Sequence, residues 1–236
     1  MKYLISKILL ISIFLIIDCG SFYQTKHLVY STRSSAFYRI PKDEIKGKEF
    51  IQGKFIHPFP IQPEKLTDIL GNLRFKKHTQ IGSLNDYVFH LNELSTLTAD
   101  LSQVLENLKP EDCVMGISMF DHIESVISNN KRTTFLLWVD AKGLNLVLGE
   151  IQSDVARDTA KNFLEWTQVP QISLNIVPDA NEIDSEKGQL YTFNKVNGYT
   201  NKKWLIFPLT DLNIYQLKDR KIPSVAPNAS SGKKSE

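Results

Sequence analysis

The chain has 236 residues, a length that allows one large domain or two small ones and that can bury most of its apolar surface. Its 28 basic and 26 acidic residues leave a formal net charge of +2. Binding to nucleic acid calls for a clearly basic face or domain. This balance excludes an electrostatic case for such binding, and no nucleic-acid partner is expected.

The start of the chain has the layout of a bacterial export signal. Lys2 and Lys7 make it basic, and residues 8–17 form an apolar run, interrupted only by Ser12, that precedes Cys19. A helix that crosses a bilayer needs about 20 apolar residues, so this shorter run predicts a signal peptide, residues 1–18, that is removed. The removal takes away two lysines and one aspartate and leaves a net charge of +1.

The residues around the cysteine, Ile16-Ile17-Asp18-Cys19, resemble the lipobox of bacterial lipoproteins. Asp18 departs from the small neutral residue of that pattern and resembles the more permissive lipobox of spirochaetes. The resemblance covers only the export segment. It implies that Cys19 is acylated, becomes the new N-terminus and holds the chain on a membrane. Gly20, in place of aspartate, resembles the enterobacterial sorting signal for the outer membrane of the cell envelope; the side that the domain faces stays open.

Two other interpretations of Cys19 stay open. One is cleavage by ordinary signal peptidase at a small-x-small site, which is poorly matched because no alanine precedes Ala36. The other is an uncleaved anchor in which Cys19 is an ordinary thiol. If Cys19 carries lipid, Cys113 is the only remaining thiol and no intramolecular disulfide forms. The apolar stretch 113–117 predicts that Cys113 is buried and unreactive.

We expect a single folded domain at residues 47–217, between a tether and a tail. Residues 19–46 are rich in Ser, Thr, Tyr and Lys and predict a tether, with only weak signals for a strand at 27–30 or 36–40. Residues 218–236 have almost nothing apolar to bury and predict a disordered tail.

The domain is predicted to begin with a strand at 49–56. The sequence His57-Pro58-Phe59-Pro60 ends it because proline supplies no amide hydrogen to a sheet. Two roles are open for this corner: a rigid exposed recognition element, or a strand end whose Phe59 packs into the core. The second role is favoured.

Apolar side chains at helical spacing predict three helices. They lie at 63–74, 91–108 and 153–169, and the second has a continuous leucine-rich stripe. Pro63 suits the first turn of the first helix.

Further strands are predicted at 87–90, 114–120, 133–139, 144–151, 172–177, 190–193 and 204–208. Short turns join the strands between 114 and 151, which predicts an antiparallel meander with one face covered by the leucine-striped helix. The predicted fold class is therefore α+β, an antiparallel sheet of about five to seven strands with two or three helices packed mainly on one face.

The sequence contains no motif for a nucleophile elbow, a phosphate loop, a zinc protease or a dinucleotide site. The histidines are scattered singly, at His27, His57, His78, His90 and His122. One cluster, Asp121-His122 with Glu124 nearby, falls at a strand end. Neighbouring strand residues point to opposite faces, so a solvated strand end is favoured there over a metal or catalytic site.

Two further groups have an ordinary structural interpretation. Trp138, Trp166 and Trp204 lie on predicted apolar faces, which favours core packing over a ligand pocket. The acidic residues Asp179, Glu182, Asp184 and Glu186 lack the spacing of an EF-hand, which favours a solvated loop over a calcium site.

Lipidation of Cys19 is therefore the only predicted site, and no catalytic residue, metal or cofactor is expected. The sequence predicts a lipid-anchored envelope lipoprotein that acts as a binding or scaffolding module, with a protein partner in the envelope or the host and an undetermined oligomeric state. Two alternatives stay open: a surface-exposed adhesin that binds host proteins, and an envelope hydrolase with an unrecognised site.

Overall fold

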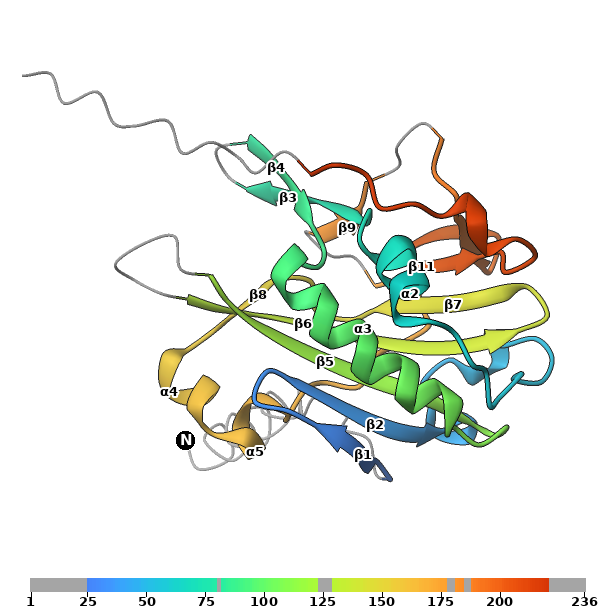
Figure 1. Ribbon diagram of the computed structural model, residues 1–236, viewed down its shortest axis with the longest axis horizontal. Coiled ribbons are helices and arrows are strands. Elements are labelled where there is room, and N and C mark those ends of the chain that lie inside the picture. The colour runs from blue at the N-terminus through green and yellow to red at the C-terminus, as the bar shows by residue number, and fades with distance from the viewer. Residues whose placement is uncertain (1–24, 80–81, 123–128, 178–180, 185–187, 221–236) are drawn as a thin grey trace, which may run out of the picture.

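The computed structural model describes residues 25–79, 82–122, 129–177, 181–184 and 188–220 (Figure 1). The predicted signal peptide and Cys19 lie outside these ranges. Within the ranges, no helix combines the length and the apolar character that a membrane crossing requires.

The main sheet has eight antiparallel strands in the order β1-β2-β5-β6-β7-β11-β10, with β8 paired to β6. A smaller sheet has the order β4-β3-β9. The fold class predicted from the sequence, an α+β protein with an antiparallel sheet, is confirmed. The bounds are β1 His27–Ser31, β2 Ser35–Pro41, β3 Arg74–Thr79, β4 Gly82–Tyr87, β5 Asp112–His122, β6 Asn129–Asp140, β7 Gly143–Leu148, β8 Ser153–Val155, β9 Asn181–Ile183, β10 Thr192–Val196 and β11 Tyr199–Phe207.

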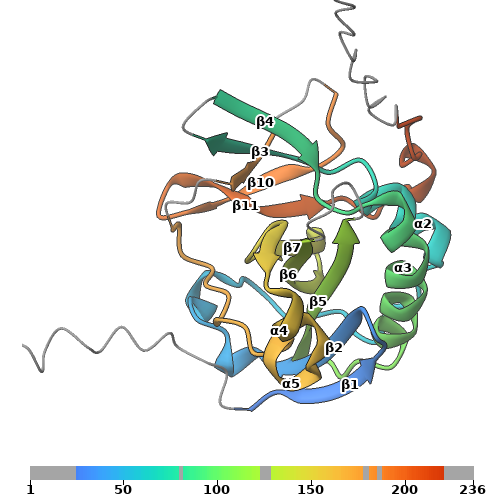
Figure 2. The same cartoon turned by 90° about the vertical axis from the view of Figure 1, so that its left-hand side faces the viewer.

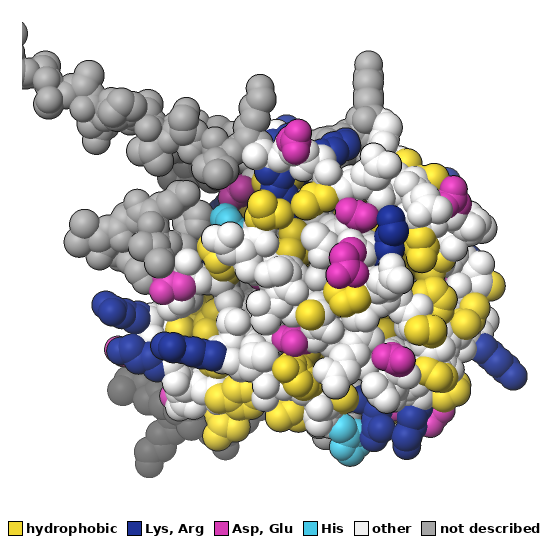
Figure 3. Space-filling model, in the orientation of Figure 1, with side chains coloured by type: hydrophobic (Ala, Val, Ile, Leu, Met, Phe, Trp, Pro, Cys, Tyr) yellow, Lys and Arg dark blue, Asp and Glu magenta, His cyan; other side chains and the backbone are white. Residues whose placement is uncertain are grey.

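Two helices, α2 (Pro63–Leu70) and α3 (Leu91–Glu106), cover one face of the main sheet (Figure 2). Both begin at the predicted residues, and Pro63 occupies the first turn of α2. The predicted end of the first helix at residue 74 is wrong, because α2 ends at Leu70 and Arg74 begins β3. The leucine stripe of α3 is buried against the sheet, as expected for an amphipathic helix. Over this face, acidic and basic side chains are interspersed with apolar ones (Figure 3).

The predicted tether is wrong from residue 27 onward, because β1 and β2 belong to the main sheet. β2 lies between β1 and β5, and its side chains enter the cores on both sides of the sheet. Phe37 packs on the α3 side, whereas Ala36 and Ile40 pack on the other. A strand buried on both faces lacks the apolar–polar alternation that marks a half-exposed strand.

The single helix predicted at 153–169 is also wrong. Residues 153–155 are β8, and two short helices follow, α4 (Arg157–Lys161) and α5 (Phe163–Trp166). The side chain of Asn162 accepts a hydrogen bond from the Leu164 amide at 3.1 Å and begins α5. Asn162 is thus the N-cap of a new helix, and it divides into two short helices a segment whose apolar spacing predicts one long helix.

The strand predicted at 49–56 is wrong. The 3₁₀ turns η1 (Lys42–Glu44) and η2 (Lys48–Phe50) precede an extended loop, in which Ile51 and Phe55 pack onto the second face of the sheet. The loop makes a hydrogen bond from the Ile56 amide to the Val139 carbonyl at 2.8 Å. Residues 172–177 likewise form no strand, although Ser173 makes a single bridge to Lys46.

The second face of the sheet has its own core. Trp138, Trp166 and Trp204 are each at most 2% exposed there, which confirms that they pack in the core. Cys113 lies in the same core, and burial raises the pKa of its thiol. It is therefore buried and held in the unreactive protonated form, as predicted.

Candidate functional site

A cavity of about 250 Å³ lies between α2, the small sheet and the segment that follows β11. We call residues 208–220 the C-terminal strap; they include a 3₁₀ turn, η3 (Leu212–Ile214), and run back toward α2 as the red trace in Figure 1. The strap supplies one wall of the cavity, and residues 188–191 and Phe207 supply another. Cavities of this kind between structural elements are common binding sites for small ligands.

Hydrogen bonds to Asp68 in α2 and to Asn72, two residues after its end, hold the strap in place. The Leu217 amide donates to Asp68 Oδ1 at 3.0 Å, and the Lys218 amide donates to Asn72 Oδ1 at 2.9 Å. Asn72 Nδ2 in turn donates to the Gln216 carbonyl at 2.8 Å. The side chains of Asp68 and Asn72 therefore replace a strand partner for this irregular backbone.

Arg220 fixes the end of the strap. Its Nη1 donates to the Phe89 carbonyl at 2.7 Å and its Nη2 donates to the Gly71 carbonyl. The guanidinium carbon lies 4.1 Å from the ring centre of Tyr87, in a cation–π contact. Residues 218–220 are thus held against the domain, and the predicted disordered tail begins too early; residues 221–236 lie outside the described ranges.

Three aromatic rings form a connected group at the cavity. The ring centres of Tyr191 and Phe207 are 5.5 Å apart, and those of Phe207 and Tyr215 are 6.2 Å apart. The Tyr215 hydroxyl is 2.8 Å from the Pro208 carbonyl and 3.2 Å from that of Leu190, and burial raises its pKa to about 12. Tyr215 is therefore a neutral hydrogen-bond donor that ties the strap to the opposite wall.

Two acceptor groups in the lining have no partner among the described residues. The backbone of Asp184 is engaged, since its amide donates to the Arg74 carbonyl and its carbonyl accepts from the Tyr191 hydroxyl, but its carboxylate makes no such contact. Gln189 Nε2 donates to the Tyr191 carbonyl at 3.3 Å, whereas its Oε1 is buried and unbonded. A buried acceptor without a donor, such as Gln189 Oε1, is costly, and the half-buried Asp184 carboxylate adds a negative charge beside it. Both groups are suited to meet a donor from a ligand.

The lining also includes two apolar side chains that are accessible. Leu190 is 43% exposed and Ile214 is 44% exposed. They come from the two walls of the cavity, residues 188–191 and the strap. Exposed apolar groups beside a cavity provide contact area for a ligand or for a partner protein.

A second cavity of about 200 Å³ lies on the other face of the sheet. Its polar groups are engaged within the chain: Thr134 Oγ1 accepts from the Glu150 amide at 2.9 Å, Asn201 Nδ2 donates to the Leu174 carbonyl at 3.1 Å, and Lys203 Nζ donates to the Gly149 carbonyl at 2.8 Å. The first cavity, which offers unbonded acceptors, is the better candidate.

A polar row crosses the main sheet under the start of α3. Ser35, Ser118 and Thr133 lie side by side on β2, β5 and β6. Ser35 Oγ donates to Asp100 Oδ2 at 3.1 Å, and Ser118 Oγ donates to Glu93 Oε1. The row thus meets two carboxylates that α3 presents seven residues, or two turns, apart.

The environment of these carboxylates favours their neutral form. Burial raises the pKa of Glu93 to about 7, although hydrogen bonds from Ser118 and from the His90 amide, and the charge of Arg220, oppose the shift. Burial also raises the pKa of Asp100. Ser118 is only 2% exposed, so a substrate has no access to its hydroxyl. We therefore interpret the row as a structural hydrogen-bond network rather than a catalytic site.

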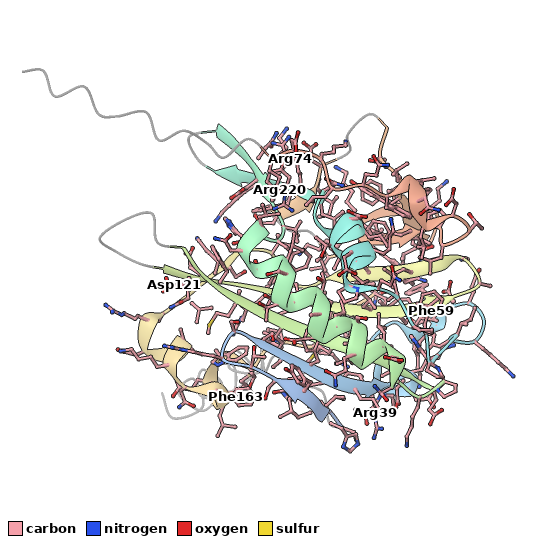
Figure 4. All side chains as sticks on the ribbon, in the orientation of Figure 1. Arg39, Phe59, Arg74, Asp121, Phe163 and Arg220 are labelled. Atoms are coloured by element: carbon pink, nitrogen blue, oxygen red, sulfur yellow. The ribbon has the colours of Figure 1, made fainter. Side chains whose placement is uncertain are left out.

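The residues singled out in the sequence do not assemble into this cavity, with the exception of Asp184. Asp121 is exposed at the end of β5 (Figure 4), where it pairs with Asn130, and Glu124 lies outside the described ranges. Glu182 forms an ion pair with Lys202 at 2.6 Å. Across the described ranges, no three His, Cys, Asp or Glu side chains are grouped to hold a metal ion.

His57 is buried and its Nε2 accepts a hydrogen bond from the Val139 amide at 3.4 Å. Desolvation lowers its pKa to about 4, so it is neutral near pH 7. Phe59 packs partly against the core, as favoured for the proline corner, but the corner follows a loop and not the predicted strand. No pattern in the sequence indicates the cavity itself, because its walls come from segments up to 150 residues apart.

Glu93→Gln tests the interpretation of the polar row through the pH dependence of stability. The folded chain holds the Glu93 proton up to a pKa of about 7, whereas an unfolded glutamate releases it near 4.5. The folded state therefore binds more protons between these values, and the free energy of unfolding falls as the pH rises through them. Glutamine should remove about 1 to 3 kcal/mol of that fall, measured by urea unfolding at about pH 5 and about pH 8.

Glu106→Gln is the matched control, because Glu106 is exposed on the same helix. It should leave the pH dependence unchanged. Burial also raises the pKa of Asp100, so part of the pH dependence of the free energy of unfolding remains in both variants. An unchanged slope in Glu93→Gln would contradict the assignment.

Asn72→Ala tests how the strap is held. The substitution removes the acceptor for the Lys218 amide and the donor to the Gln216 carbonyl, each hydrogen bond being worth about 0.5 to 1.5 kcal/mol. Hydrogen exchange of the Lys218 amide should become roughly tenfold faster. Asn107→Ala is the control, since Asn107 Nδ2 donates only within α3, to the Gln103 carbonyl. Equal exchange rates in the two variants would show that the strap is held by other contacts.

We found no family model, curated protein or solved structure that matches the chain.

Proposed function

We propose that this chain is a lipid-anchored protein of the bacterial cell envelope, and that its folded domain is a binding module with the cavity as its binding site. The export segment and Cys19 support the anchor through their resemblance to a lipobox. The outer membrane is the proposed location, on the resemblance of Gly20 to the sorting signal.

The single observation that carries the binding role is the composition of the cavity. It combines three connected aromatic rings with two unbonded acceptors and two accessible apolar side chains, within about 250 Å³. Binding sites typically combine apolar walls with a few placed polar groups. The volume is at the small end for ligand sites, which suits a small molecule or one side chain of a partner.

The order of the strands supports the same proposal. The chain enters the domain at β1, one edge of the main sheet, whereas the cavity adjoins Phe207 at the end of β11, with β2, β5, β6 and β7 between them. A tether attached before β1 leaves the cavity at the far side of the sheet from the point of attachment. The module therefore presents its binding site away from its anchor.

Cys19→Ala tests the anchor. Cells that express the native chain and are given a labelled fatty acid should label it, and the variant should lose both the label and its membrane fraction, because the acylated thiol is missing. Cys113→Ala is the control, since it removes the buried thiol and leaves position 19 intact. Equal label in the native chain and in Cys19→Ala would contradict the anchor.

A photo-crosslinking amino acid at Ile214 tests the binding site. Irradiation of envelopes that contain this variant should give a discrete adduct, because Ile214 belongs to the cavity lining and is 44% exposed. Leu164 is the control position: it is also apolar, is 77% exposed, and lies on α5, outside the cavity. The proposal fails if Ile214 gives no adduct, or if both positions give the same adduct with equal yield.

A further inference from the structure

We infer that the cavity recognises an organic cation, an alkylammonium or guanidinium group on an apolar stem. This inference rests on the proposed function, because it names the chemical class of ligand for the same site. The cavity has a polar end and an apolar end, and the groups at both ends suit such a ligand.

The polar end offers negative charge that nothing in the described structure uses. The Asp184 carboxylate has no hydrogen bond or ion pair there, whereas the other acidic residue of the lining, Asp68, is occupied by the Leu217 amide and by Lys65 at 3.4 Å. The unbonded Gln189 Oε1 is a second acceptor. A carboxylate and an amide oxygen without donors are matched by a ligand that carries several N–H groups.

The aromatic rings fit the same ligand. The faces of Tyr and Phe rings attract cations, and the effect grows when the site is desolvated. Tyr191 links the two ends of the site, because its hydroxyl donates to the Asp184 carbonyl at 3.0 Å while its ring meets Phe207. A cation beside Asp184 therefore lies close to the aromatic group.

Two basic residues also line the cavity, but within the described ranges neither forms an ion pair with the Asp184 carboxylate. Arg74 stands opposite Asp184 across β3 and β9, where the Asp184 amide donates to the Arg74 carbonyl, and its guanidinium carbon lies 5.6 Å from the ring centre of Tyr87 on β4. Arg74 and Arg220 lie next to each other near the start of α3 (Figure 4). The side chain of Lys218 is exposed to solvent, which screens its charge.

The accessible Leu190 and Ile214 favour a cation on an apolar stem over a bare amine. That chemistry has two sources, a free alkylamine and a lysine or arginine side chain of a partner protein. The two sources differ in how much apolar surface they bring to these residues, so they are separable by affinity.

The test is a titration of the purified mature protein, followed by the NMR signals of Tyr191 and Tyr215, with butylammonium, 1-butanol and butyrate as probes of equal length. Butylammonium should bind, and 1-butanol and butyrate should bind at least tenfold more weakly. Asp184→Asn should weaken butylammonium binding about tenfold, since it removes the charge and keeps the shape. Glu182→Gln removes an equal charge two residues away, outside the lining, and should leave the affinity unchanged.

A Leu-Lys-Leu peptide with blocked ends distinguishes the two sources. Binding at least tenfold tighter than butylammonium would support a partner side chain, and equal or weaker binding would support a free amine. Equal binding of butyrate or 1-butanol, unchanged affinity in Asp184→Asn, or no binding by either amine probe would overturn the inference. Crosslinking at Ile214 would still decide the proposed function separately, because it does not depend on the charge of the ligand.

Discussion

The structure depends on the burial of both faces of the strands at the centre of the main sheet. Along β6, alternate side chains enter opposite cores: Phe135 and Leu137 pack toward α3, whereas Leu136 and Trp138 pack on the other face. Each of them is fully buried, so the sheet is stable only if both faces are covered. Helices α2 and α3 cover one face. The short helix α5 and irregular chain, including Ile51 and Phe55, cover the other face.

This constraint also explains which elements could be predicted. Helices α2 and α3 each have one buried stripe, and the meander of β5, β6 and β7 has short turns, so local pattern is sufficient to find them. β2 is buried on both faces and its Ser35 belongs to the polar row, so the strand signal at 36–40 is weak and the sequence predicts a tether there. The segment 49–56 has the composition of a strand because it covers an apolar face as a loop.

The candidate site could not be predicted, for a different reason. Asp68, Asp184 and Tyr215 come from three distant segments, and what brings them together is largely hydrogen bonding between side chains and backbone. Such contacts leave no periodic pattern in the sequence. Arg220 illustrates the point, since a tail without apolar residues is held by two backbone carbonyls and one ring. Only the acidic character of the segment around Asp184 was visible beforehand.

The position of β1 has a mechanical consequence for a chain held at its start. β1 is an edge strand with a single neighbour, β2, and its exposed Leu28 and Val29 contribute little to either core. Force applied ahead of residue 25 would first load the hydrogen bonds from the Thr25 amide to Glu44 Oε2 and from Lys26 Nζ to the Thr167 carbonyl, and then the hydrogen bonds between β1 and β2. β1 would therefore detach from the sheet before the central strands, and the part of the sheet beside the cavity would stay intact.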